Sequence, residues 1–79
     1  MKFSVGETVI LTKPLYTIGY PLDVNSAWKI LEIRDLRLPR PIIAKRVRSP
    51  FDRWVFNEAC FTALSDFSPL ELKIFGVRK

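Results

Sequence analysis

Histidine is absent from this sequence of 79 residues, and cysteine occurs once, at Cys60. Without histidine, the chain lacks the commonest general base, the commonest zinc ligand and the usual partner of a serine or cysteine nucleophile. A lone cysteine forms no internal disulfide and gives no ligand spacing for a metal site. Because Cys60 stands between Ala59 and Phe61, we expect a buried, inert thiol and no metal site.

Glycine and long apolar runs are also scarce. The three glycines lie far apart, so no glycine-rich loop is present to hold a phosphate or a cofactor. The eight carboxylates are scattered singly. We therefore expect no catalytic residues, no cofactor and no small-molecule substrate. No apolar run approaches the roughly 20 residues of a membrane-spanning helix, and no export signal is evident at the N-terminus. These features predict a cytoplasmic protein that does not act at a membrane.

Apolar residues are nevertheless plentiful. They make up 48% of the sequence and aromatic residues 13%, which is typical of a packed core rather than of disorder. A chain of this length forms one domain with one core. We expect Trp28 and Phe61 to be anchors of that core.

The N-terminal third predicts a strand followed by a loop. Residues 3–12 alternate with a period of two, which places Phe3, Val5, Val9 and Leu11 on one side of an extended chain, with a bend near Gly6. Residues 12–27 contain two prolines and several turn-forming residues, which indicates a long loop of functional interest.

The middle of the chain predicts a strand and a hairpin. Residues 28–36 favour a strand because they are rich in β-branched and aromatic residues, although a helix beginning near Ser26 remains an alternative. Residues 37–41 hold two prolines and form a connector. Residues 42–56 read as two strands joined by a turn at residues 49–52.

The last part of the chain predicts a helical turn and a final short strand at residues 57–64, then a helix. Ser68, Pro69 and Glu71 have the spacing of a helix start with a capping box, and Gly76 would end the helix. A strand is the alternative there, because Leu70, Leu72 and Ile74 also alternate.

The order of these elements resembles an SH3-like barrel. The opening FSVGETVIL, the long loop, the short strands and the closing segment RWVFNEACFTAL at residues 53–64 carry this resemblance over residues 3–64. It implies a mostly β fold, a small SH3-like barrel of about five short strands at residues 1–66, with an appendage at residues 67–79 that forms a short C-terminal helix. The helical turn lacks the proline of the SH3 peptide groove, so we do not expect binding of proline-rich peptides. No glycine follows the first strand as in KOW modules, so their RNA contact is not implied either.

Charge is concentrated in the middle of the chain. Residues 34–53 hold seven cations against two carboxylates, whereas residues 1–33 and 54–79 are each neutral, so the whole net charge of +5 lies in this segment. Six of the seven cations are arginine, which offers a planar donor fork to phosphate and carboxylate groups. We expect Arg46 and Arg48 to project from one face of a strand, with the flanking cations nearby.

The predicted site is therefore this basic surface. It consists of Arg37, Arg40, Lys45, Arg46, Arg48 and Arg53. Trp54 either adds a stacking surface or belongs to the core, and a possible aromatic groove consists of Tyr16, Tyr20 and Trp54.

Two partners fit such a surface. The first is nucleic acid, bound with little sequence specificity. The second is an acidic protein surface, in which case the chain is an adaptor or a small inhibitor. A solvated face that serves only solubility is the alternative to both.

Overall fold

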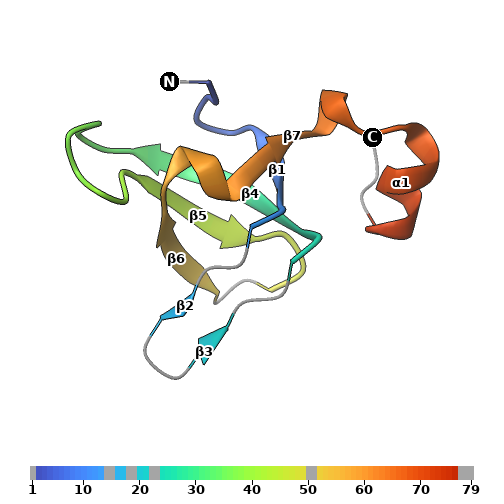
Figure 1. The fold of residues 1–79 in the computed structure, drawn as a ribbon, viewed down its shortest axis with the longest axis horizontal. Helices are drawn as coiled ribbons and strands as arrows, with labels where there is room; N and C mark the ends of the chain where they lie inside the picture. Colours follow the sequence, from blue (N-terminus) through green and yellow to red (C-terminus); the bar gives the residue numbers. More distant parts are fainter. Residues whose placement is uncertain (1, 14–15, 18–19, 22–23, 50–51, 77–79) are drawn as a thin grey trace.

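The computed structural model describes residues 2–13, 16–17, 20–21, 24–49 and 52–76, with the backbone alone for residues 16–17 and 20–21. A five-stranded antiparallel sheet has the order β6-β5-β4-β1-β7 (Figure 1). Its strands are β1 (Thr8–Leu11), β4 (Ser26–Ile33), β5 (Ile42–Arg46), β6 (Arg53–Phe56) and β7 (Phe61–Ala63). The first strand thus lies between the second and the last strands of the sheet.

A strand is confirmed in the region of residues 28–36, because β4 spans Ser26–Ile33 and pairs with both β1 and β5, but it ends before residues 34–36, which were predicted to belong to it. A shift in register between Ile30 and Glu32 marks a bulge in this strand. The predicted connector also lies where expected, between β4 and β5. In the following hairpin, residues 50–51 of the predicted turn lie outside the described residues.

Short elements complete the fold. The predicted long loop contains a two-stranded hairpin, β2 (Tyr16–Thr17) and β3 (Tyr20–Pro21). The predicted helical turn is η1 (Glu58–Cys60), and a second such turn, η2 (Leu64–Asp66), follows β7. The helix prediction is confirmed as α1 (Pro69–Ile74), with both hydrogen bonds of the capping box between Ser68 and Glu71. Gly76 follows this helix with φ +75°, a left-handed conformation that favours glycine.

The main core lies on one face of the sheet. Trp28 and Phe56 are fully buried with ring centroids 5.0 Å apart, and Phe56 lies 4.7 Å from Phe61. The predicted burial of Trp28, Phe61 and Cys60 is therefore confirmed. The complete cluster consists of Phe3, Val9, Leu11, Trp28, Ile30, Ile42, Ala44, Phe56, Cys60 and Phe61.

The placement of Val5 corrects the predicted pattern of the first strand. Val5 was expected to share a side with Phe3, Val9 and Leu11, but it is 62% exposed. The reason is the turn at Gly6, whose φ of +89° interrupts the extended chain before β1 begins at Thr8. The predicted bend at Gly6 is confirmed, and it takes Val5 out of the alternation.

A second buried region covers part of the opposite face. Ile10 stands between Val9 and Leu11, so its side chain points away from the main core, yet it is fully buried. Leu72 of α1 is also buried outside the main cluster, and η2 lies against β1. The C-terminal segment thus shields this face at β1. In Figure 1, α1 lies at one side of the sheet, and the connector between β4 and β5 lies at the other.

The fold is therefore mostly β, with one short C-terminal helix, as predicted. The sheet is not closed in the described part of the chain, because β6 and β7 are its two edges, so a barrel is not confirmed. Among the described residues, no helix has the length and apolar character needed to cross a membrane.

Candidate functional site

Three cations face one another across neighbouring strands. Lys29 of β4 is the register partner of Lys45 of β5, and Lys45 is the partner of Arg53 of β6. Directly opposed residues point to the same face of a sheet. Because the adjacent positions Trp28, Ile30 and Ala44 belong to the core, these cations lie on the outer face. We call Lys29, Lys45 and Arg53 the cation row.

The cation row is accessible to solvent and to ligands. Lys29 and Arg53 are exposed and Lys45 is half-buried. With adjacent strands about 4.8 Å apart, the row extends over roughly 10 Å. No carboxylate of the described residues forms an ion pair with any of the three. Glu32 faces the same side in the next register row, opposite Ile43. Directly opposed like charges destabilise a sheet, so the row carries a cost to folding that an anionic ligand would offset.

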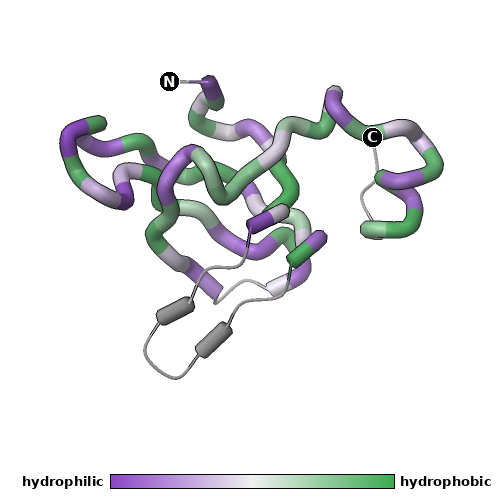
Figure 2. Tube along the Cα trace, viewed as in Figure 1, coloured by the Kyte–Doolittle hydropathy of each residue, from purple (hydrophilic) through white to green (hydrophobic). Residues whose placement is uncertain are grey.

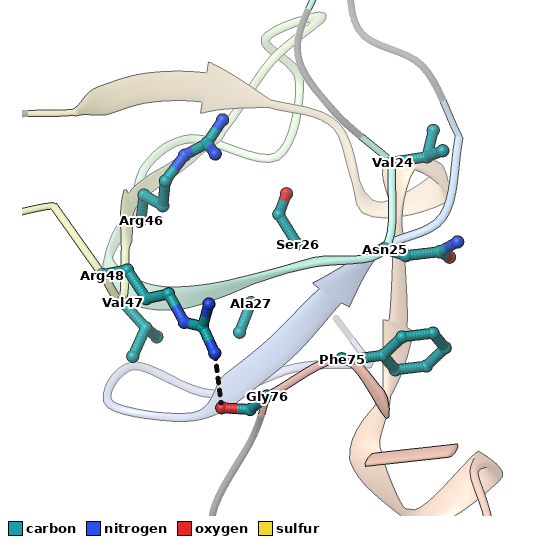
Figure 3. A pocket seen from close by; sticks show the side chains of 9 residues that line it. All are labelled: Val24, Asn25, Ser26, Ala27, Arg46, Val47, Arg48, Phe75 and Gly76. Carbon is teal, nitrogen blue, oxygen red and sulfur yellow. Dashed lines mark hydrogen bonds between the residues drawn. The ribbon is translucent and has the colours of Figure 1, made fainter. Parts of the chain in front are cut away.

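A pocket adjoins this face at the turn after β5 (Figure 3). It has a volume of about 210 Å³ and lies between the beginning of β4, the turn at residues 46–48 and the end of α1. Arg48 lies in the turn because β5 ends at Arg46, and its Nη2 donates a long hydrogen bond of 3.5 Å to the backbone oxygen of Gly76. Figure 3 shows the guanidinium groups of Arg46 and Arg48 on different sides of the turn, with Arg48 directed toward Gly76.

Arg46 has a structural role. It is the register partner of Trp28, and its guanidinium lies over the Trp28 ring at 5.3 Å. Its Nε is 3.4 Å from a carboxylate oxygen of Asp52, and its side chain is only 24% exposed. Arg46 therefore covers the edge of the core and does not lie on the face that carries the cation row.

Arg37 and Arg40 lie at the opposite end of β5, in the connector between β4 and β5. Arg37 donates to Asp35 through Nε, at 3.1 Å, and through Nη2, at 2.8 Å. These bonds lower the pKa of the Asp35 carboxyl and raise that of Arg37. The backbone oxygen of Arg40 accepts a bond from Arg34. The length of β5, about 16 Å for its five residues, separates these two arginines from Arg48.

The aromatic residues predicted for the site differ in what the structure describes of them. Trp54 is the register partner of the buried Ala44 and packs partly against the core, so it points to the face opposite Arg53. The side chains of Tyr16 and Tyr20 lie outside the described residues, and the aromatic groove stays a prediction. The buried Cys60 donates from Sγ to Asn57 Oδ1 at 3.4 Å.

The structure thus brings together Lys45, Arg53 and Arg48 from the predicted set and adds Lys29. Sequence reasoning missed Lys29 because it stands in a segment with no net charge. The signal that would have found it is alternation, since Lys29 stands between the buried residues Trp28 and Ile30. Its meeting with Lys45 depends on strand register, which charge counting does not reveal.

Comparisons with known proteins do not extend this description. A scan against protein-family models, a search of curated proteins and a search of solved structures each find no match to this chain. The chain's own geometry is therefore the basis for the function proposed below.

Proposed function

We propose that this chain is a non-enzymatic binding module that holds nucleic acid on the outer face of β4, β5 and β6 with little sequence specificity. The cation row carries this proposal. Lys29, Lys45 and Arg53 supply closely spaced positive charge that the sheet itself does not neutralise with an ion pair in its described part. Phosphates are spaced at intervals of a few ångströms along a nucleic-acid strand, so a linear row of cations matches them.

The low specificity follows from the chemistry of the row. Lysine and arginine contacts to phosphate position a nucleic acid without reading its bases. Trp54, which would provide a stacking surface for bases, points to the other face of β6. Base recognition therefore has no aromatic contribution from this residue, and the affinity depends mainly on charge.

The proposal includes a finer description of the fold. We infer that the sheet belongs to an SH3-like barrel, an inference supported by the position of β1 between β4 and β7 and by the η1 turn between β6 and β7. The cytoplasmic location expected from the single cysteine is part of the same proposal.

Binding of labelled oligonucleotides across a salt series tests the proposed function. Single-stranded DNA, duplex DNA and RNA would each be titrated with the protein at low and rising salt. If Lys29, Lys45, Arg53 and Arg48 contact phosphates, the logarithm of affinity falls with the logarithm of salt at a slope of about −3.6 for duplex DNA and about −2.8 for a single strand. Negligible binding at low salt to all three contradicts the proposal.

A second candidate function, docking on an acidic protein, is favoured by the connector between β4 and β5. Leu36 is 57% and Leu38 42% exposed there, beside the exposed Arg37 and Arg40. Figure 2 shows hydrophilic and hydrophobic residues following one another along this segment. Exposed leucines contribute little to contacts with phosphate but fit an apolar depression on a protein.

Variants in the connector and in the cation row distinguish the two proposed functions experimentally. If the second function is correct, changing Leu36 and Leu38 to serine abolishes capture of an acidic protein, and Lys45→Gln does not. If nucleic acid is the partner, the leucine changes leave oligonucleotide affinity intact.

A further inference from the structure

The pocket at the end of β5 reaches the face that carries the cation row through Ala27. The backbone N–H of Val47 donates to the oxygen of Ala27 at 3.0 Å, which extends the pairing of β4 and β5 beyond Trp28 and Arg46. Ala27 lines the pocket and stands two residues before Lys29 on the same side of β4. Two strand residues span about 7 Å, so the pocket lies next to the end of the row.

The lining of the pocket favours an anion. Its lining includes two arginines, Arg46 and Arg48, and the polar residues Asn25 and Ser26, and no carboxylate is among the described residues that line it. The Arg46 guanidinium lies over the Trp28 ring and so belongs to the other face of the sheet. Asp52 pairs with Arg46, which leaves Arg48 as the main cation available to a ligand. Arg48 has five N–H donors, and the structure uses one for the long bond to Gly76. Its remaining donors suit the oxygens of a phosphate group.

The size of the pocket limits what it holds. Its volume of about 210 Å³ lies below the roughly 300–1,000 Å³ of sites for drug-sized ligands. A phosphate group with part of a sugar fits such a volume better than a whole nucleotide with its base.

We propose that this pocket binds a phosphate monoester at the end of a nucleic-acid strand whose backbone lies along the cation row. The inference rests on the proposed nucleic-acid function and adds a preferred position on the strand. A terminal phosphate monoester carries more negative charge than the internal diesters, so Arg48 would distinguish an end from the middle of a strand.

The test compares oligonucleotides of one sequence that carry a 5′-phosphate, a 3′-phosphate or hydroxyl groups at both ends. We expect one phosphorylated end to bind about tenfold more tightly than the unphosphorylated strand, because a charge-assisted contact is added. Arg48→Gln should remove this preference and retain most binding of the unphosphorylated strand. Lys73→Gln, an equal change of charge on α1, should keep the preference. Melting temperatures establish that each variant is folded.

A nuclear magnetic resonance titration makes the test independent of these variants. The preferred oligonucleotide should shift the backbone amide signals of Asn25 and Ser26 more than its unphosphorylated counterpart does. Inorganic phosphate, added as a separate probe, distinguishes a free ion from a strand end. Shifts with inorganic phosphate, combined with equal affinity for all three oligonucleotides, would overturn the strand-end proposal.

The outcomes distinguish this inference from the proposed function. Equal, salt-dependent binding of all three oligonucleotides overturns the strand-end proposal and leaves the cation row as a nucleic-acid surface. An absence of binding to every oligonucleotide at low salt overturns both. A preference for one phosphorylated end that persists in Arg48→Gln contradicts the role assigned to Arg48.

Discussion

Lys45 stands between two other cations, with Lys29 opposite on one side and Arg53 on the other. Each directly opposed pair of like charges costs a sheet a few tenths of a kcal/mol to about 1 kcal/mol. The same three charges are the basis of the proposed function. The positive charge of Lys45 should therefore lower the stability of the fold and raise the affinity for nucleic acid, and the two effects can be measured separately.

Replacing Lys45 with glutamine should stabilise the protein while weakening its binding of nucleic acid. The expected gain in the free energy of unfolding is about 0.3–1 kcal/mol at low salt, because two repulsive pairs are removed. The gain should shrink as added salt screens the charges. Chemical denaturation at two salt concentrations measures it, with Lys73→Gln as the matched control. A Lys45→Gln protein less stable than the wild type at low salt would contradict this account.

Arg37 should control the protonation of Asp35. Its hydrogen bonds favour the carboxylate and hold the pKa of Asp35 below the ordinary value. Because the pKa is lowered in the folded state, the contribution of this pair to stability is present above the pKa of the unfolded chain. It is lost as the pH falls through the lowered folded value.

A nuclear magnetic resonance titration of the Asp35 carboxyl measures this effect. We expect Arg37→Gln to raise the pKa toward its ordinary value, although the backbone N–H of residue 37 still donates to the carboxylate, and Arg40→Gln, in the same connector, to leave the pKa unchanged. An unchanged pKa in Arg37→Gln would show that another group holds the carboxylate.

Trp28 should be the most costly core residue to truncate. It is fully buried, packs edge-on against Phe56 and donates from Nε1 to Ser26 at 2.8 Å. Trp28→Ala should cost about 3–5 kcal/mol, which approaches the whole stability of a small domain. Denaturation measures this loss. The exposed Val5→Ala is the control and should change stability by less than about 0.5 kcal/mol. Similar stabilities for the two variants would contradict the core assignment.

At the scale of elements, the sequence was most informative about the features that neighbouring residues determine. The helix start at Ser68 and the bend at Gly6 depend on a few adjacent residues, and both were predicted correctly. The alternation of Trp28 and Ile30 likewise indicated a strand. Val5 was misplaced because alternation was continued through Gly6, whose left-handed conformation redirects the chain.

The candidate site was only partly predictable, because it depends on which strands pair. Arg40 and Arg48 are eight residues apart in the sequence, but an extended strand separates them in space. Lys29 is distant from Arg53 in the sequence, yet register places both in one row through Lys45. Strand pairing arises only in the folded sheet, and it cannot be deduced from any single segment of the sequence.

The capping box should stabilise the first turn of α1. Ser68 Oγ accepts from the Glu71 amide at 3.2 Å, and Glu71 accepts from the Ser68 amide at 3.0 Å. Ser68→Ala should cost about 1 kcal/mol and speed hydrogen exchange of the Leu72 amide about fivefold. Ser65→Ala, an exposed serine of η2 with no such cap, is the control. Equal exchange rates in the two variants would contradict a role for the cap.

At the scale of the whole molecule, the charge is divided between two ends of β5. The connector holds Arg37 and Arg40, and the other end holds the cation row with Arg48. A net charge of +5 on a chain of this size attracts polyanions from a distance. In the proposed function, the row and the pocket provide the contacts to nucleic acid, whereas Arg37 is paired with Asp35.

The salt dependence of binding in matched double variants tests the central claim most directly. Changing Lys45 and Arg53 to glutamine removes two charges from the row, and changing Lys13 and Lys73 removes two exposed charges outside it. We predict that the slope of log affinity against log salt becomes less steep by about two in the row variant and stays unchanged in the control. Equal slopes in the two double variants would contradict the assignment of the nucleic-acid surface to the cation row.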